Sequence, residues 1–385
     1  DMGKIIADVQ LVTPGEAVRR VSVSITDSGH IGKILDPSET ESGNEVLFDG
    51  GGELKLWPGF IDIHTHGANG FDLSHATHEA VETIAEAKLA EGVTTFLPTT
   101  WTASQEDKLA MAKAAAAYRE NQRFARTPFL HIEGPYLNPV QAGAQDPQYM
   151  RKPSVDEIKA IHEICPVGLV SLAIELDDAL EFIGEMKSLG IVTSAAHSDA
   201  TYAEFLSARK AGLRHLTHYC NQLSRLHHRE VGLVGAALLD DKVMIEMICD
   251  KVHLCPEMIE LVFKHRDCDR IILITDSIAA SHLGDGIYPL GDTKIVVRDG
   301  EARIPEGNLA GSIAMYHEVV RNVAQITSIP LSEIARCSSV NQARSLRLSD
   351  RGSIQEGLLA DLTLLDADFN PQATFVGGEM RYTRS

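Results

Sequence analysis

Short apolar segments alternate with amphipathic ones through the middle of the chain, and this alternation limits the fold more than any other feature. Eight segments have the length and apolar content of buried strands: Phe60–Ile63, Thr94–Leu97, Phe129–Ile132, Val170–Ile174, Ile191–Ser194, His215–Thr217, Val243–Met247 and Ile271–Ile274. Between them, apolar residues recur every three or four positions, as in a helix, at 76–90, 106–118, 179–189, 202–211 and 256–265. This pattern predicts an α/β fold of the (β/α)8 TIM-barrel type, with a doubly wound open sheet as the alternative.

The two ends of the chain have a different pattern. Short β-type runs separated by turn-forming residues occur at 4–7, 21–25 and 46–48, and again at 357–365 and 373–376. We therefore expect a small β-sandwich domain built from both termini, residues 1–55 and 350–385. The barrel is then expected to occupy residues 56–349.

Charge and composition narrow the classes of partner. The 385 residues carry a formal net charge of -19, which argues against binding to nucleic acid or to an anionic membrane. There is no uninterrupted apolar stretch long enough to span a bilayer, and the N-terminal segment lacks the pattern of a secretory signal. The six cysteines show no CxxC spacing, which favours reduced thiols and a cytoplasmic location.

In a barrel of this type the active site lies at the carboxyl ends of the strands, so these ends are the places to look for chemistry. The first strand ends in His64 and His66, within the sequence PGFIDIHTHGANG. Residues two apart in a strand point to the same face, so both imidazoles are expected on one side. A pair of histidines alone is weak evidence for a divalent metal.

Other strand ends strengthen the metal interpretation. Strand three ends at Glu133, strand five at His197, strand six at His218 and strand eight at Asp276. These side chains can converge with the first-strand pair across the mouth of a barrel. The sequence therefore predicts a metal centre there.

The remaining histidines that we considered are not expected to bind a metal. His131 is expected to pack beneath the site, and seven others are expected to be solvated or structural: His75, His78, His162, His215, His265, His282 and His317. The loop 221–232, NQLSRLHHREVG, is rich in polar donors. It is either a solvated loop or part of an anion pocket.

Taken together and in this order, several motifs resemble a known family. They are PGFIDIHTHGANG, HIEGPYLNP, AAHSDA, LTHYCNQLSRLHHRE with GLVGAALLDD, ITDSIAA and NLAGS. The set is similar to that of the N-acetylglucosamine-6-phosphate deacetylases of the amidohydrolase superfamily, and the similarity runs through essentially the whole chain.

The resemblance implies roles for individual residues. Glu133, His197 and His218 match the family's principal metal ligands, and Asp276 matches its catalytic acid/base. The pair His64 and His66 matches a second metal site that only some members retain. Positions that match substrate or phosphate contacts are Ala144, Asn221, Gln222, Arg229, His253, Leu309, Ala310 and Gly311. The family also suggests a homodimer in which Arg229 reaches the neighbouring subunit's pocket.

Two departures from the family pattern concern the substrate. Where the family often has histidine after Gly-Ala, this chain has Gln145, which can donate a hydrogen bond to a carbonyl oxygen but carries no charge. The family's usual Asn-Ala-Met reads Asn221-Gln222-Leu223 here. The larger Gln222 side chain could narrow the pocket or add a contact.

The reaction that the resemblance implies is removal of the acetyl group from N-acetyl-D-glucosamine 6-phosphate, giving D-glucosamine 6-phosphate and acetate. One or two divalent metal ions are expected, zinc first, with iron, manganese or cobalt as alternatives. Alternative substrates are N-acetylgalactosamine 6-phosphate and unphosphorylated N-acetyl sugars. A cyclic-amide hydrolase is a further alternative, although no lysine stands at these strand ends to bridge two metals. The non-enzyme alternative is a sugar-phosphate sensor.

Overall fold

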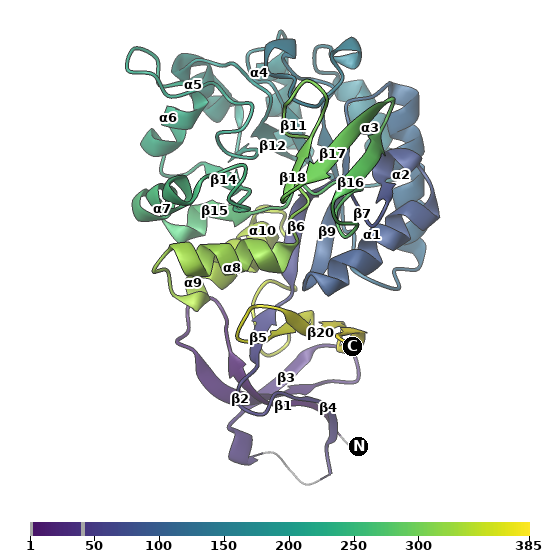
Figure 1. The fold of residues 1–385 in the computed structure, drawn as a ribbon, viewed down its shortest axis with the longest axis vertical. Coiled ribbons are helices and arrows are strands. Elements are labelled where there is room, and N and C mark those ends of the chain that lie inside the picture. Colours follow the sequence, from purple (N-terminus) through teal and green to yellow (C-terminus); the bar gives the residue numbers. More distant parts are fainter. Residues whose placement is uncertain (1–2, 40–42) are drawn as a thin grey trace.

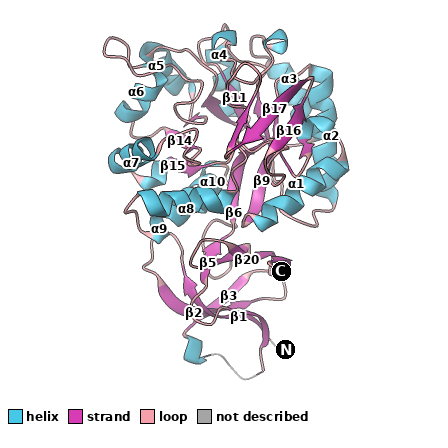
Figure 2. Ribbon diagram, viewed as in Figure 1, coloured by secondary structure: helices cyan, strands magenta, loops and turns pink. Residues whose placement is uncertain are grey.

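The computed structural model describes residues 3–39 and 43–385, which form a larger part with helices and a smaller part made of strands (Figure 1). Both ends of the chain lie in the smaller part. Figure 2 shows the helices gathered around the larger part, whereas the smaller one consists almost entirely of strands and loops.

The larger part contains eight parallel strands in the order of their sequence, in the described part of the chain. They are β6 (Phe60–Thr65), β9 (Val93–Thr100), β10 (Leu130–Glu133), β11 (Val167–Leu172), β12 (Val192–Ala195), β13 (His215–Leu216), β14 (Met244–Met247) and β15 (Ile271–Leu273). Within residues 3–39 and 43–385, ten α-helices accompany them: α1 (His78–Ala90), α2 (Gln105–Glu120), α3 (Val155–Ile164), α4 (Ala179–Ser188), α5 (Tyr202–Ala211), α6 (Gly232–Leu239), α7 (Pro256–His265), α8 (Tyr316–Ile326), α9 (Leu331–Ala335) and α10 (Asn341–Ser345). The predicted barrel is confirmed, and each of the eight predicted strands is present with slightly shifted ends.

Alternate residues of the barrel strands contribute to two different cores. Phe60 and Phe96 pack with helical residues in the outer core, whereas Ile61, Ile63 and Leu97 belong to a second cluster. Because parallel strands are covered on both faces, they read as nearly continuous apolar runs, which is why the sequence revealed them.

The smaller part is one mixed sheet with strands from both termini, which confirms a β domain assembled from the two ends of the chain. Its strands are β1 (Lys4–Leu11), β2 (Arg19–Ile25), β3 (Ile31–Leu35), β4 (Glu45–Asp49), β5 (Lys55–Pro58), β19 (Leu362–Leu365), β20 (Pro371–Val376) and β21 (Glu379–Thr383). Strand β5 leads through Gly59 directly into β6. The small sheet therefore lies at the amino end of the first barrel strand, opposite the end that carries His64 and His66.

An antiparallel hairpin extension follows the last barrel strand and was not predicted. It consists of β16 (Gly286–Leu290), β17 (Thr293–Arg298) and β18 (Glu301–Arg303). Figure 1 shows it in green across the front of the larger part. Its partly exposed strands alternate polar and apolar residues and interrupt the strand–helix repeat.

At the seam that closes the barrel, backbone hydrogen bonds join β6 to the segment after β15: the Asp276 N–H donates to the His64 carbonyl oxygen at 2.8 Å, and the His66 N–H donates to the Ser277 carbonyl oxygen at 2.8 Å. Buried side chains add to this seam. Lys88 of α1 is fully buried at this seam, and its ammonium donates to Asp62 at 3.0 Å, Glu91 at 3.2 Å, Ser277 at 3.1 Å and Thr275 at 3.3 Å. Burial alone would lower the pKa of Lys88, but the carboxylates of Glu91 and Asp62 outweigh burial and raise it. The charged side chain of Lys88 therefore links helix α1 to both edges of the barrel sheet, which are β6 and the segment after β15.

Changing Lys88 to alanine is expected to destabilise the fold by about 3–5 kcal/mol, because it leaves two buried carboxylates without their cation. Equilibrium denaturation followed by circular dichroism measures this. Lys264→Ala is the matched control: Lys264 pairs with Glu260 at 2.6 Å but its side chain is 66% exposed, so a loss of under about 1 kcal/mol is expected. Equal unfolding midpoints for the two variants would contradict this account of the seam.

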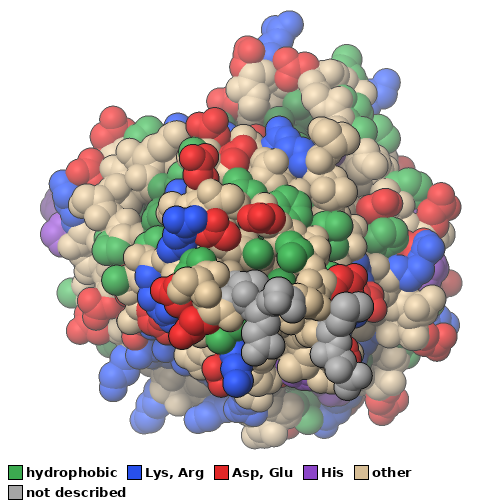
Figure 3. All heavy atoms as spheres, turned by 90° about the horizontal axis from the view of Figure 1, so that it is seen from below, with side chains coloured by type: hydrophobic (Ala, Val, Ile, Leu, Met, Phe, Trp, Pro, Cys, Tyr) green, Lys and Arg blue, Asp and Glu red, His purple; other side chains and the backbone are tan. Residues whose placement is uncertain are grey.

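The described surface and helices agree with the composition. On the face that includes the small sheet, Lys and Arg side chains are interspersed with acidic and apolar ones (Figure 3). Among the described residues, no helix has the length and apolar character needed to cross a membrane.

Candidate active site

Four histidines surround one buried carboxylate at the carboxyl ends of the barrel strands. The Glu133 carboxylate lies 2.6 Å from His64 Nε2, 3.6 Å from His66 Nε2, and 3.8 Å from the Nε2 atoms of His197 and His218. All five side chains are at least 94% buried. Two groups that could hold a metal result, and Glu133 belongs to both of them.

The spacing of the imidazole nitrogens fits metal binding. His64 Nε2 and His66 Nε2 are 3.3 Å apart, as are His197 Nε2 and His218 Nε2. Two nitrogens bound tetrahedrally to one zinc ion at about 2.0–2.1 Å would be roughly 3.3–3.4 Å apart. Each pair therefore has the separation of two ligands of a single ion.

The other ring nitrogen of three of these histidines is held by a backbone carbonyl. The Nδ1 atoms of His66, His197 and His218 lie 3.1, 2.7 and 2.9 Å from the carbonyl oxygens of Thr99, Gln141 and Asn221. Metal-binding histidines commonly donate their second N–H in this way, which fixes the ring and directs Nε2 at the ion.

The electrostatics of the cluster also favour a cation. Burial would lower the pKa of His66, but hydrogen bonds with Asp276 and Glu133 outweigh it and raise that pKa to about 9. By contrast, burial and the nearby His197 lower the pKa of His218 to about 4. The carboxylates of Glu133 and Asp276 thus stabilise a positive charge on His66 even though the site is buried. A divalent ion can take over that role by displacing protons.

Asp276 faces the same cluster from the segment after β15. Its Oδ1 lies 3.2 Å from the Nε2 atoms of both His64 and His66. Burial would raise the pKa of Asp276, but these imidazoles outweigh burial and hold it well below its usual range. Asp276 is therefore a carboxylate, able to accept a proton.

Three residues of the cluster have left-handed backbone conformations. The φ angles are 44° at His197, 29° at His218 and 50° at Asp276. Such conformations cost free energy in residues with a Cβ and are concentrated at functional sites. The loop that contains Gly311 packs closely against Asp276. A residue with a Cβ does not fit at this position, because the added Cβ would lie 2.7 Å from the Asp276 carbonyl oxygen.

Gln145 contacts the central carboxylate directly. Its side-chain amide donates to Glu133, while its carbonyl oxygen accepts from the Thr102 backbone N–H at 2.9 Å. One N–H of the amide remains for another acceptor. Gln145 therefore orients Glu133 and also lines the cavity above it.

A cavity of about 240 Å³ opens above this cluster, and we call it the reactive pocket. The sequence-predicted residues that line it are His66, Glu133, Ala144, Gln145, His197, His218, Asn221, Gln222, His253, Asp276, Leu309 and Gly311. Two predicted residues do not line the cavity. His64 is buried in the cluster below the cavity, and Ala310 is buried within the 309–311 loop.

Arg229 does not line this pocket. Its side chain is exposed, and its guanidinium lies 2.7 Å from His228 Nε2. His253, in contrast, is held at the pocket by Asp250, whose Oδ2 is 2.7 Å from His253 Nδ1. Burial would lower the pKa of His253, but Asp250 outweighs burial and raises it. A cationic His253 suits an anionic group of a ligand.

Besides Gly143 and Gly307, sequence reasoning missed three residues that line the pocket. Trp101 follows β9 directly and stacks on His66, with ring centroids 3.9 Å apart, while its Nε1 donates to Asp72 at 2.6 Å. It could have been found, because it stands at the end of strand two. Arg303 and Asn308 come from the hairpin extension and the turn after it, for which the strand–helix alternation gives no signal.

The other histidines remain outside the cluster. His131 lies beneath it, as predicted: its Nδ1 is 2.9 Å from the Ile63 carbonyl oxygen and its Nε2 2.6 Å from Ser171 Oγ. His215 is likewise buried, and its nitrogens contact Glu246 and Ser345. It lies in β13, fully buried and outside the cluster, which agrees with a structural role.

Comparison with known proteins places the chain in a family. Residues 56–381 match the model of the amidohydrolase family. N-acetylglucosamine-6-phosphate deacetylase of Bacillus subtilis is 33% identical over 98% of this chain and 97% of its own length. The crystal structure of N-acetylglucosamine-6-phosphate deacetylase from Thermotoga maritima is 37% identical, covers 99% of this chain and 100% of its own, and has a TM-score of 0.89.

A further solved structure has a bound sugar. It is a mutant N-acetyl-D-glucosamine-6-phosphate deacetylase from Mycobacterium smegmatis in complex with N-acetyl-D-glucosamine-6-phosphate. It is 30% identical, covers all of both chains and has a TM-score of 0.91. The residue pattern at the strand ends, the barrel and these similarities agree, and the chain belongs to the amidohydrolase family.

Proposed function

We propose that this protein removes the N-acetyl group from N-acetyl-D-glucosamine 6-phosphate by hydrolysis of the amide C–N bond, giving D-glucosamine 6-phosphate and acetate. The observation that carries the proposal is the cluster of four histidines around Glu133, with Asp276 beside it, at the floor of a pocket of about 240 Å³. Relatives named for this activity cover nearly the whole chain, which supports the choice of substrate.

Glu133, His197 and His218 would hold the principal divalent ion, and His64 and His66 with Glu133 could hold a second. Zinc suits these nitrogen and oxygen donors, as do iron, manganese and cobalt. When bound, such an ion lowers the pKa of water and withdraws electron density from a carbonyl oxygen.

Asp276 would take the proton of the attacking water and pass it to the amide nitrogen as the C–N bond breaks. The free N–H of Gln145 would donate to the carbonyl oxygen as negative charge develops there, which is typically worth roughly 3–4 kcal/mol per donor. Cleavage gives the amine and acetic acid and restores the carboxylate of Asp276, and the acid then gives up its proton to the amine, so that acetate and the ammonium form result.

The rest of the pocket would bind the sugar phosphate. Asn221, Gln222 and His253 would contact its polar groups, with His253 on the phosphate, and Ala144 and the loop Leu309-Ala310-Gly311 would lie along the ring. Binding energy from the remote phosphate would orient the acetamide over the reacting groups. We propose that the enzyme works in the cytoplasm, as a homodimer.

Acetate release from a panel of N-acetylated sugars tests the proposal. N-acetylglucosamine 6-phosphate is expected to give the highest kcat/KM, above its galactosamine epimer and above unphosphorylated N-acetylglucosamine. Equal rates on phosphorylated and unphosphorylated sugars would show that the phosphate contacts are misassigned. Hydrolysis of a cyclic amide instead would contradict the reaction, and metal-free, inactive protein would favour a sensor.

Arg229 is expected to act on the phosphate across a dimer interface, because its exposed side chain lies outside the pocket of its own subunit. Arg229→Ala should lower kcat/KM for the 6-phosphorylated sugar by about a hundredfold, or roughly 2.7 kcal/mol, and leave the rate on the unphosphorylated sugar nearly unaltered.

Mixed dimers provide the decisive control. A subunit with Arg229→Ala keeps its metal ligands, and one with His197→Ala keeps its arginine, so co-expressed mixtures should regain activity that neither variant has alone. If mixing restores nothing although mixed dimers form, Arg229 does not act across the interface.

A further inference from the structure

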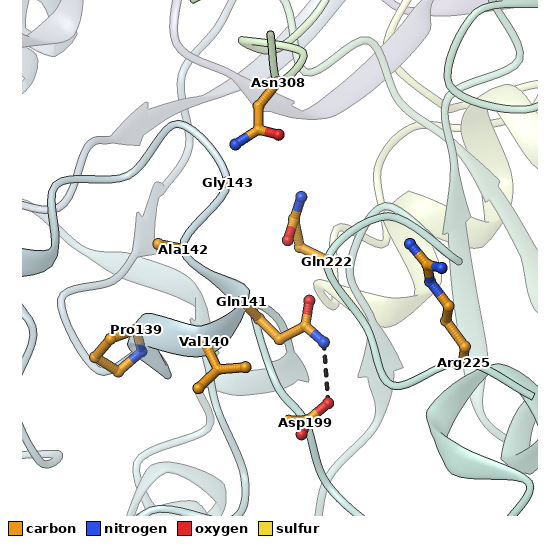
Figure 4. Close-up of a pocket in the computed structure, with 9 residues that line it drawn as sticks. All are labelled: Pro139, Val140, Gln141, Ala142, Gly143, Asp199, Gln222, Arg225 and Asn308. Atoms are coloured by element: carbon orange, nitrogen blue, oxygen red, sulfur yellow. Dashed lines mark hydrogen bonds between the residues drawn. The ribbon is translucent and has the colours of Figure 1, made fainter. Parts of the chain in front are cut away.

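One histidine of the cluster, His64, is not held by a backbone carbonyl. The other three each direct Nδ1 at a carbonyl oxygen. For His197 this oxygen belongs to Gln141, whose side chain donates to Asp199 at 3.0 Å beside a cavity of about 630 Å³ (Figure 4), so the holding loop is itself fixed. His64 Nδ1 has no hydrogen-bond partner in the described part of the chain, although the side chain is fully buried.

The nitrogen of His64 that faces the cluster is Nε2. It lies 2.6 Å from the Glu133 carboxylate and 3.2 Å from that of Asp276. A neutral imidazole that binds a metal through Nε2 carries its proton on Nδ1. In His64 this N–H would be a buried donor without an acceptor, which is unfavourable and rare in folded proteins.

A buried carboxyl oxygen that also lacks a partner faces this nitrogen. Glu246 belongs to β14, and its Oε1 lies 4.0 Å from His64 Nδ1, with both side chains fully buried. Among the described residues, no group donates a hydrogen bond to Oε1. Because buried polar groups nearly always have partners, a donor and an acceptor that face each other without any are complementary. A shift of about 1 Å would bring them to hydrogen-bond distance.

The other oxygen of Glu246 holds the carboxyl group in this orientation. Its Oε2 accepts from His215 Nδ1 at 3.0 Å and from Ser194 Oγ at 3.4 Å. His215 Nε2 in turn lies 2.6 Å from Ser345 Oγ. If Glu246 served only to hold His215, its Oε1 would stay buried and unpaired. The contacts on Oε2 therefore fix the side chain and leave Oε1 for His64.

We propose that Glu246 is a positioning residue for the second metal ion, and that its Oε1 accepts from His64 Nδ1–H when His64 Nε2 binds that ion. The hydrogen bond fixes the tautomer and the plane of the ring, as the backbone carbonyls do for the other three histidines. Glu246 does not line the reactive pocket and belongs to neither group of candidate ligands, so it acts only through His64. The inference rests on the second ion of the proposed function.

Glu246→Gln tests the proposal, because the amide keeps the volume of the side chain but has one acceptor oxygen in place of two. His215, at 3.0 Å, is nearer to the Glu246 carboxyl than His64 is, at 4.0 Å, so we expect the amide oxygen to face His215 and the NH2 group to face His64. The affinity for the second zinc ion should fall about 10–100-fold, while that for the principal ion stays within about threefold. Stepwise removal of zinc from the loaded protein by a chelator of known affinity, with the remaining zinc counted by mass spectrometry, measures both affinities.

Ser345→Ala is the matched control, because it removes the partner of His215 on the far side of Glu246 and leaves Glu246 and His64 unchanged. We expect both zinc affinities of this variant to equal those of the parent. The positioning role would be overturned by equal weakening of both ions in Glu246→Gln, by no weakening, by the same loss in Ser345→Ala, or by a parent protein that binds a single zinc ion. A parent that binds two zinc ions but releases no acetate from any N-acetylated sugar would instead overturn the proposed function.

Discussion

Replacing His197 by alanine is expected to remove most of the bound metal and to lower kcat/KM by about a thousandfold or more, roughly 4 kcal/mol. The reason is geometric. His197 Nε2 faces His218 Nε2 at 3.3 Å, and its own Nδ1 is fixed by the Gln141 carbonyl at 2.7 Å. Alanine removes one of the three side chains proposed to hold the principal ion and leaves the backbone in place.

Metal content by mass spectrometry of dialysed protein, together with acetate release, measures this effect. His265→Ala is the matched control, because His265 is an exposed histidine at the end of α7. His64→Ala should remove at most a second equivalent of metal. Full metal content and activity in the His197 variant would show that the principal ion is held elsewhere.

Replacing Asp276 by asparagine should lower kcat by about 10²–10⁴-fold while metal content and KM change little. An amide has nearly the shape of the carboxylate but cannot accept the proton of water at neutral pH. The low pKa of Asp276 in the folded protein means that its basic form is the one present at that pH.

Steady-state kinetics on the 6-phosphorylated sugar, with metal content measured in the same samples, separate catalysis from binding. Asp285→Asn serves as control, since Asp285 is an exposed carboxylate in the loop after the last barrel strand. A residual kcat within about tenfold of the parent would assign the proton transfer to another group.

The barrel and the cluster of candidate metal ligands were predictable from the sequence because both depend on local patterns along the chain. Parallel strands covered on both faces must be apolar, so β6 and its neighbours stood out, and the residues that follow them had to meet at one edge. His64, Glu133 and Asp276 were identified by that reasoning alone. The resemblance then added the expected roles of individual residues.

The surroundings of the cluster could not be predicted in this way. Arg303 and Asn308 come from the hairpin extension, which lies outside the strand–helix repeat and reaches the pocket only in the folded chain. Lys88 at the seam likewise gives a sequence signal no different from that of any other helical lysine.

The sequence by itself thus determined the order of strands and helices and the residues at the strand ends, because parallel strands buried on both faces are continuous apolar runs whose ends are marked by the change to polar residues. Only the tertiary structure decided the 3.3 Å spacing of the imidazole pairs and the burial of Lys88. These depend on contacts between segments far apart in the chain, and no local pattern records such contacts.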